Sequence, residues 1–106
     1  MPYNIGSRGS CMLGGNLATN CGGSSVIRYK SLRSNTVGLE AVLADGTILN
    51  DMSTMRKDNS GYDLKQLMIG SEGTLGIITA AALTCPVVPQ EKRLAMIAVS
   101  SFDKCV

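Results

Sequence analysis

The clearest pattern of apolar and polar positions lies between residues 37 and 50, in the sequence VGLEAVLADGTILN. One apolar run ends at Val42-Leu43, a second begins at Ile48-Leu49, and the polar pair Asp45-Gly46 stands between them. An Asp-Gly pair between two apolar runs is a strong signal for a tight turn that joins antiparallel strands. The pattern therefore predicts a β-hairpin over residues 37–50.

A polar, irregular stretch over residues 52–63 follows the hairpin and leads into a short predicted helix over 64–70. By its spacing this helix places three apolar side chains on one face: Leu64, Leu67 and Met68. Asp63 precedes the helix as a candidate N-cap, and Gly70 is expected to end it.

Two further strands are predicted after this helix. An apolar, β-branched run over 77–88 is bounded by Pro86 and Pro89, and residues 93–101 alternate loosely between apolar and polar. We expect an α+β fold with a mostly antiparallel sheet and a few short helices. The helices are too few and too short for a doubly wound parallel sheet.

The first quarter of the chain, residues 5–25, is rich in glycine and serine, but it also carries apolar residues that argue against a low-complexity linker. Between the doublets Gly14-Gly15 and Gly22-Gly23 the sequence predicts about one helical turn over 16–20, ended by Gly22. Three polar residues are expected near the positive end of this turn: Asn16, Thr19 and Asn20.

Composition narrows the possible functions. The chain has 106 residues, 44% of them hydrophobic and 17% charged, which fits one small globular domain. It contains no histidine, so a Ser-His-Asp triad and a histidine-ligated metal are excluded. The net charge of +2, without a run of Lys or Arg, argues against a dedicated nucleic-acid binder.

Cysteine usage and the absence of long apolar runs point to an intracellular protein. The four cysteines, Cys11, Cys21, Cys85 and Cys105, are widely spaced and form no CxxC pair, so a zinc or thioredoxin-type site is disfavoured. No stretch approaches the ~20 apolar residues that span a bilayer. The first residues show neither a signal-peptide profile nor an Arg-rich leader, and we interpret the cysteines as reduced thiols.

Two glycine-bearing loops carry the candidate chemistry. The loop Ser71-Glu72-Gly73-Thr74-Leu75-Gly76 lets the backbone approach a ligand closely, and its main-chain N–H groups can bind phosphate or heterocycle carbonyls. The loop over 9–16 is a second candidate, although it is neither a GxGxxG fingerprint nor a P-loop. For each loop a purely structural role, a tight turn or a capped helix start, stays open. Together they favour one binding site, to which both loops contribute.

Four segments of the sequence carry a resemblance to a known family: SCMLGGNLATNCGG, RYKSLRSNTVGLEAVLADGTIL, RKDNSGYDLKQLMIGSEGTLGIIT and the following CP. Over residues 5 to 90 the chain resembles the FAD-linked D-2-hydroxy-acid dehydrogenases of the vanillyl-alcohol-oxidase and p-cresol-methylhydroxylase (PCMH) superfamily. The resemblance implies that residues 1–106 form the second subdomain of a PCMH-type FAD-binding domain. It also implies that the pyrophosphate loop lies before this segment, and that the substrate domain, with its histidines, lies after it.

The same resemblance implies the residues that contact FAD. They belong to the two glycine-bearing segments: Gly9, Ser10, Cys11, Gly14, Gly15, Asn16, Thr19, Asn20, Gly22 and Gly23 in the first, and Glu72, Gly73, Thr74, Gly76, Ile77 and Ile78 in the second. The chain departs from the family pattern at a few positions: Met12, Cys21, Lys30 and Arg33-Ser34. The family usually has glycine at position 30, and if that position requires a positive φ, a side chain there costs ~1 kcal/mol or more.

Three function hypotheses follow. The first is the FAD-binding portion of an oxidoreductase that converts a D-2-hydroxy acid, such as 2-hydroxyglutarate or lactate, to the 2-oxo acid; no residue of this chain is its catalytic base. The second is a non-catalytic flavin- or nucleotide-binding or structural fragment. The third, a thiol redox or metal protein, is disfavoured by the cysteine spacing.

The expected partners are FAD and, once the missing domain is present, a small 2-hydroxy acid. Nucleic acid and a membrane span are not expected. Self-association through the exposed flavin face is a further expectation, because an uncovered apolar face favours association. The resemblance implies a mitochondrial location, with the cytoplasm as the alternative.

Overall fold

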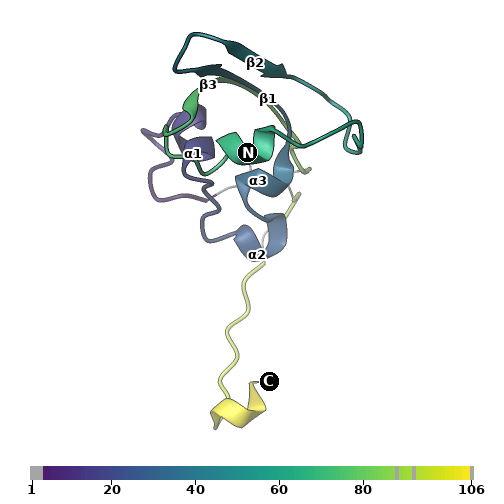
Figure 1. The fold of residues 1–106 in the computed structure, drawn as a ribbon. Coiled ribbons are helices and arrows are strands. Elements are labelled where there is room, and N and C mark those ends of the chain that lie inside the picture. The colour runs from purple at the N-terminus through teal and green to yellow at the C-terminus, as the bar shows by residue number, and fades with distance from the viewer. Residues whose placement is uncertain (1–3, 88, 92, 106) are drawn as a thin grey trace.

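A three-stranded antiparallel sheet covers a group of short helices. The computed structural model describes residues 4–87, 89–91 and 93–105. Its elements are α1 (Leu13–Ala18), α2 (Val26–Tyr29), α3 (Leu32–Asn35), β1 (Thr36–Leu43), β2 (Ile48–Asp51), α4 (Lys65–Met68), β3 (Gly76–Leu83) and the 3-10 turn η1 (Phe102–Lys104). The strand order is β2-β1-β3 (Figure 1). The predicted α+β class with a mostly antiparallel sheet is confirmed.

The predicted hairpin is present as β1 and β2. Val42 pairs with Ile48 in the last register position before the turn. The Asp45 carboxylate accepts hydrogen bonds from the Thr47 N–H and hydroxyl, each 2.9 Å long, and these bonds hold the pKa of Asp45 below its ordinary value. Gly46 takes a φ of +84°, which a glycine adopts without strain. The turn chemistry that the sequence predicted therefore closes the hairpin.

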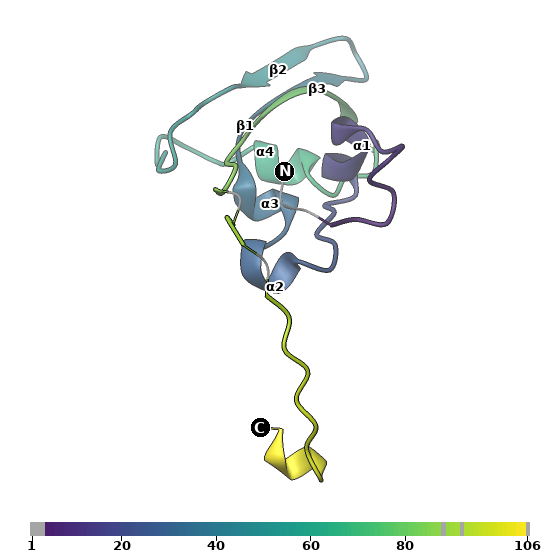
Figure 2. The ribbon, with the colours of Figure 1, turned by 180° about the vertical axis from the view of Figure 1, so that it is seen from behind.

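The core lies between the inner face of the sheet and the helices. Figures 1 and 2 show the curved sheet over α1, α3 and α4 from opposite sides. Six hydrophobic residues from the sheet and the helical layer are buried: Leu17, Leu32, Leu39, Ala41, Met68 and Ile69. No aromatic side chain belongs to this cluster. Burial of this aliphatic group fixes α1 against the sheet.

Helix α1 begins three residues earlier than predicted and includes Gly14 and Gly15. A Cβ on Gly14 would lie 3.2 Å from the Ile78 carbonyl oxygen, so the bare backbone lets α1 pack closely on β3. This packing outweighs the low helix propensity of glycine.

The position of α1 overturns two details of the prediction. Thr19 and Asn20 lie at its carboxyl end instead of its positive end, and Asn16 lies inside it. The left-handed conformation expected at Gly22 is adopted by Asn20 and Gly23, with φ of +51° and +70°.

Helix α4 is shorter than predicted. Asp63 makes no side-chain cap; its carboxylate pairs with the Lys65 ammonium at 2.7 Å, which competes for the same oxygen atoms. The predicted apolar face is wrong in part, because Leu64 and Leu67 are 43% and 63% exposed while Met68 is buried. Because α4 has only four residues, it buries one apolar side chain, that of Met68. The next residue, Ile69, supplies the second buried side chain.

The predicted strand over 77–88 appears as β3, which starts one residue earlier and ends at Leu83; Val88 lies outside the described residues. The strand expected over 93–101 is wrong for the described part of that segment. There the chain leaves the body and ends in η1 (Figure 1), with Met96 93% exposed. A strand requires a neighbouring ladder to satisfy its backbone, and the described chain offers none at this position.

Helices α2 and α3, which the sequence analysis did not predict, connect α1 to the sheet. The Asn35 side-chain amide donates to the carbonyls of Tyr29 and Ser31, at 2.6 and 2.9 Å, and so ties the two helices together. Between the helices Lys30 has a φ of +62° and a ψ of −176°, a region that almost only glycine occupies. The requirement for a positive φ at position 30 is confirmed.

Replacing Lys30 with glycine is expected to stabilise the fold. Relief of backbone strain of about 1–3 kcal/mol exceeds the extra entropy that glycine loses on folding, roughly 0.5–1 kcal/mol, for a net gain of about 1 kcal/mol. Thermal unfolding measures the change, with a rise of about 4–8 °C expected. Lys30→Ala is the control, because alanine keeps the strain; an equal rise for both variants would contradict the strain argument.

Candidate functional site

The two glycine-bearing segments lie side by side. The N–H groups of Gly70 and Glu72 donate to the carbonyls of Leu17 and Ala18, both at 3.0 Å, so the second segment is bonded directly to the end of α1. The close approach of Gly14 to the Ile78 carbonyl joins the same segments at their other end. The structure thus brings together loops that are more than 50 residues apart, as a shared site requires.

Neither backbone conformation nor packing within the described residues requires a glycine at position 15. It is exposed within α1, its φ is not positive, and a Cβ built on it would meet no atom within 4 Å. A glycine inside a helix costs roughly 0.5–1 kcal/mol relative to alanine. Gly9 stands in similarly open space in the preceding turn. Both positions leave bare backbone facing space that a bound molecule can fill.

Asn16 supplies a buried polar group beside this space. The residue as a whole is 7% exposed, and among the described residues no hydrogen bond to its side-chain amide is found. It lines a cavity of about 250 Å³ with Arg8 and Cys11, and the other walls are apolar or thiol groups from Ile5, Leu13, Cys21 and Leu32. The Asn16 side chain lines this cavity, so its amide can hydrogen-bond to a molecule bound there.

The 71–76 loop is held rigid while keeping free backbone donors. The Thr74 hydroxyl and N–H both donate to the Ser71 carbonyl, at 2.7 and 3.0 Å. Glu72 and Gly73 have φ of +51° and +81°, and a Cβ on Gly73 would point into open space. Among the described residues the N–H groups of Gly73 and Leu75 have no acceptor. These two free N–H groups, on either side of the bonded Thr74, are available to an anion or a carbonyl.

Other predicted contact residues have structural partners of their own. A Cβ on Gly23 would lie 2.6 Å from the Asn4 carbonyl, and one on Gly22 would lie 2.8 Å from a Val26 methyl. The Asn20 side chain accepts a hydrogen bond from the Arg33 N–H at 3.0 Å, and the Thr19 hydroxyl donates to the Gly15 carbonyl at 3.1 Å. These positions therefore hold the first glycine-bearing segment in place through packing and hydrogen bonds.

The remaining predicted residues lie around the junction. Gly76, with a φ of +156°, packs against the Val42 carbonyl where β3 begins. Ile78 faces the helical layer, whereas Ile77 points away from it and is 72% exposed. Ser10 is exposed, and Cys11 is half-buried at the cavity.

Two residues at this junction are not among the sixteen predicted contacts, although Ser71 begins the predicted 71–76 loop. The Ser71 hydroxyl is buried without a hydrogen-bond partner among the described residues. Arg8 lines the cavity next to Asn16 and gives it a positive charge. Both stand directly beside predicted loop residues, but neither residue type carries a distinctive spacing that sequence analysis could have used.

Known proteins give this geometry a context. A family model described as an FAD binding domain matches residues 1–51. The chain is 56% identical to the mitochondrial D-2-hydroxyglutarate dehydrogenase of Danio rerio over 104 residues, which is 98% of this chain and 20% of that protein. It is 57% identical to the Bos taurus protein of the same name over 102 residues, 96% of this chain and 19% of the relative.

The chain is homologous to part of the FAD-binding region of these dehydrogenases. It is also 42% identical to a D-2-hydroxyglutarate–pyruvate transhydrogenase of Saccharomyces cerevisiae over 102 residues, 96% of this chain and 21% of that protein. The resemblance to the D-2-hydroxy-acid dehydrogenase family is confirmed, and FAD is the cofactor of the matched domain. The chain spans about a fifth of the length of these relatives.

The relatives also bear on location and partners. Both vertebrate relatives are named as mitochondrial proteins, which supports a mitochondrial location by resemblance. Within the described residues, no helix has the length and apolar character needed to cross a bilayer. In the same residues no three His, Cys, Asp or Glu side chains are placed to hold a metal ion.

Proposed function

We propose that this chain forms the second subdomain of an FAD-binding domain in an oxidoreductase that converts a D-2-hydroxy acid to its 2-oxo acid. The observation that carries the proposal is the pairing of two open-backbone segments, with Gly15 unpacked and the Asn16 amide unpartnered beside it. The substrate class comes from the dehydrogenases to which the chain is similar.

In this proposal the chain binds and orients the cofactor and does not carry out proton transfer. When bound, FAD would supply the hydride acceptor for oxidation at the α-carbon of the substrate. The Asn16 amide and the free N–H groups of Gly73 and Leu75 are suited to carbonyl, ring-nitrogen or phosphate oxygen acceptors. The sixteen positions named from the family resemblance remain the proposed site, in which Thr19, Asn20, Gly22 and Gly23 also hold the first glycine-bearing segment in place. A base for the substrate hydroxyl belongs to other parts of the enzyme.

The alternative is a non-catalytic flavin-binding or structural fragment. It rests on the fact that the chain spans only about a fifth of its relatives, so that part of the cofactor's contact surface lies elsewhere. FAD binding excludes the structural fragment, because an inert fragment does not bind the cofactor saturably; a non-catalytic flavin-binding fragment is distinguished by oxidation of a D-2-hydroxy acid in the longer protein.

Substitution of Gly15 with alanine tests the flavin proposal. Alanine raises helix propensity, so the variant is expected to unfold at the same or a higher temperature. Its Cβ fills the open space beside Asn16, so FAD affinity is expected to fall about tenfold or more, measured by quenching of flavin fluorescence. Gly61→Ala is the matched control, because Gly61 also has open space around it but lies far along the chain in a polar loop. Equal FAD affinity for the Gly15→Ala variant and the unaltered chain would contradict the proposal.

We also propose that the surface formed by the two glycine-bearing segments, here called the flavin face, mediates self-association when no cofactor or neighbouring domain covers it. Met12 and Leu75, one in each glycine-bearing segment, are 82% and 48% exposed, and Ile77 adds a third apolar group. Sedimentation velocity is expected to show concentration-dependent association that saturating FAD or a Met12→Lys, Ile77→Lys double substitution reduces. A monomer at every concentration would refute this part of the proposal.

A further inference from the structure

A second, larger cavity lies on a different part of the molecule from the proposed flavin contacts. It has a volume of about 710 Å³ and is bounded by α2, α3, the loop after β2, α4 and the residues that follow β3. None of the sixteen proposed FAD contacts lines it. Its volume falls within the range of small-molecule sites.

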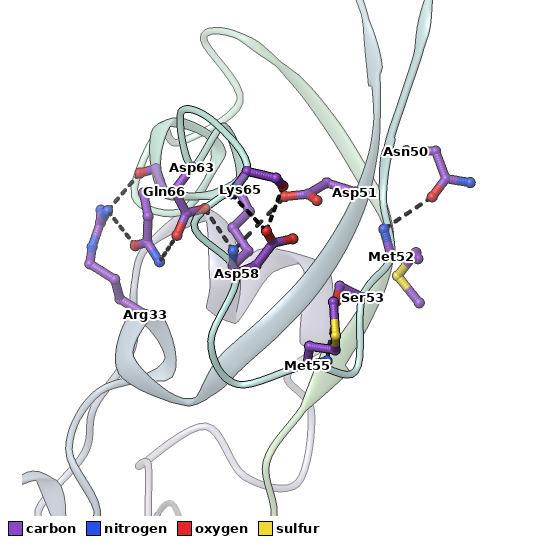
Figure 3. Close-up of polar contacts among 11 residues, drawn as sticks. Arg33, Asn50, Asp51, Met52, Ser53, Met55, Asp58, Asp63, Lys65 and Gln66 are labelled. Carbon is purple, nitrogen blue, oxygen red and sulfur yellow. Dashed lines mark hydrogen bonds and ion pairs between the residues drawn. The ribbon is translucent and has the colours of Figure 1, made fainter.

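The lining of this groove is strongly positive. Five cationic and two acidic residues line it, a net formal charge of +3 compared with +2 for the whole chain. Figure 3 shows that two of its cations already have partners: the Arg33 guanidinium is hydrogen-bonded to Gln66, and the Lys65 ammonium lies between Asp63 and Asp51. The Asp58 carboxylate accepts the Ser60 hydroxyl and N–H, which lower its pKa.

The cations at the rim have no acidic partner among the described residues. They are Arg28 on α2, Lys30 at its end and Arg56 on the facing loop. The Arg28 guanidinium makes a cation–π contact, 5.3 Å from the centre of the Tyr29 ring. Three unpaired cations from two walls of one groove repel one another and attract an anion.

Lys30 provides independent support. It holds a strained backbone conformation, with a φ of +62° and a ψ of −176°, that is suited to glycine. Strained residues of this kind persist where they serve a site. Placing an ammonium at the groove rim is a benefit that glycine cannot supply.

We propose that this groove binds a phosphate-bearing small molecule through Arg28, Lys30 and Arg56. The arginine guanidinium groups offer paired N–H donors that match phosphate oxygens, and the lysine adds a compact positive charge. A multivalent phosphate is favoured over a monovalent acid because three cations face the same space.

Isothermal titration calorimetry of the chain with pyrophosphate tests the proposal. We expect saturable binding that weakens about tenfold or more in Lys30→Gly and in Arg56→Ala, and several-fold when the ionic strength rises from about 0.02 M to about 0.2 M. The Lys30→Gly variant is expected to be more stable than the unaltered chain, so a loss of binding cannot be attributed to unfolding. Parallel titrations with ADP and citrate compare a nucleotide and a tricarboxylate with pyrophosphate, and so show which kind of anion the groove prefers.

Lys57→Ala is the matched control, since Lys57 neighbours Arg56 but does not line the groove; its affinity is expected to stay within about twofold. Equal weakening by Lys57→Ala, or unchanged affinity in Lys30→Gly, would overturn the proposal. So would competition between FAD and pyrophosphate that Lys30→Gly abolishes, because the groove would then belong to the flavin site. Failure of FAD binding in the Gly15→Ala experiment bears on the proposed function alone.

Discussion

Replacing Arg33 with methionine is expected to lower the free energy of unfolding by about 3 kcal/mol. The guanidinium donates to the Gln66 carbonyl at 2.6 Å and also to the Ile69 carbonyl, and so joins α3 to the end of α4. Methionine keeps the length of the apolar stem but leaves both carbonyls without their donor. Hydrogen bonds from a charged donor contribute about 1.5–3 kcal/mol, and an unpaired buried acceptor costs about 1–3 kcal/mol.

Urea unfolding of the Arg33→Met variant measures this loss. Arg33→Lys is the informative companion, because its single ammonium cannot reproduce the two-armed contact, and we expect it to recover less than half of the lost stability. Arg56→Met, on an exposed loop, serves as the surface control and is expected to change stability by less than about 0.5 kcal/mol. Similar stability for Arg33→Met and Arg56→Met would show that the tie between the helices contributes nothing.

Substituting Gly38 with alanine is the second large effect. Gly38 is buried in β1, where an added Cβ would lie 2.6 Å from both the backbone nitrogen and the carbonyl oxygen of Ser53. Backbone atoms cannot rotate away as a side chain can, so the segment after β2 must move off the sheet. Forced shifts of this kind cost about 1–3 kcal/mol, and we expect a loss near the upper end.

Gly61→Ala provides the comparison for this change, because a Cβ at Gly61 meets no atom within 4 Å. Thermal unfolding is expected to show a fall of about 10 °C or more for Gly38→Ala and little change for Gly61→Ala. A Gly38→Ala variant that melts with the unaltered chain would mean that the segment at Ser53 does not pack on β1.

The parts of the fold that sequence analysis predicted correctly depend on local chemistry. The Asp45-Gly46 turn and its flanking apolar runs specify the hairpin within a few residues. The family resemblance raised a positive φ at position 30 as a condition, and the structure meets it, with a φ of +62° at Lys30.

The parts that it missed depend on contacts between distant residues. Helix α1 includes Gly14 because β3 requires a bare backbone opposite Ile78, and residues 14 and 78 are far apart in sequence. Residues 93–101 have an apolar pattern suited to a strand, yet a pattern alone cannot supply a neighbouring ladder. Arg33 seemed only a departure from the family pattern, and its role depends on where α4 ends.

For the candidate site, too, some features could be predicted from the sequence and others depend on the folded chain. The glycine-bearing segments could be named from the sequence, but which glycines are open could not. Gly15 stands in open space while Gly23 is packed against the backbone of Asn4, a difference that only the folded chain determines. The sequence likewise does not show that Asn16 lies at a cavity, because that depends on how α1 packs in the fold.

The most direct test of the central claim is a backbone amide NMR titration of the chain with FAD. We predict that the amides of residues 9–16 and of 71–78 shift together with one dissociation constant, while those of Lys30 and Arg56 do not move. Shifts confined to one segment, or two segments that respond with different dissociation constants, would contradict a shared flavin site.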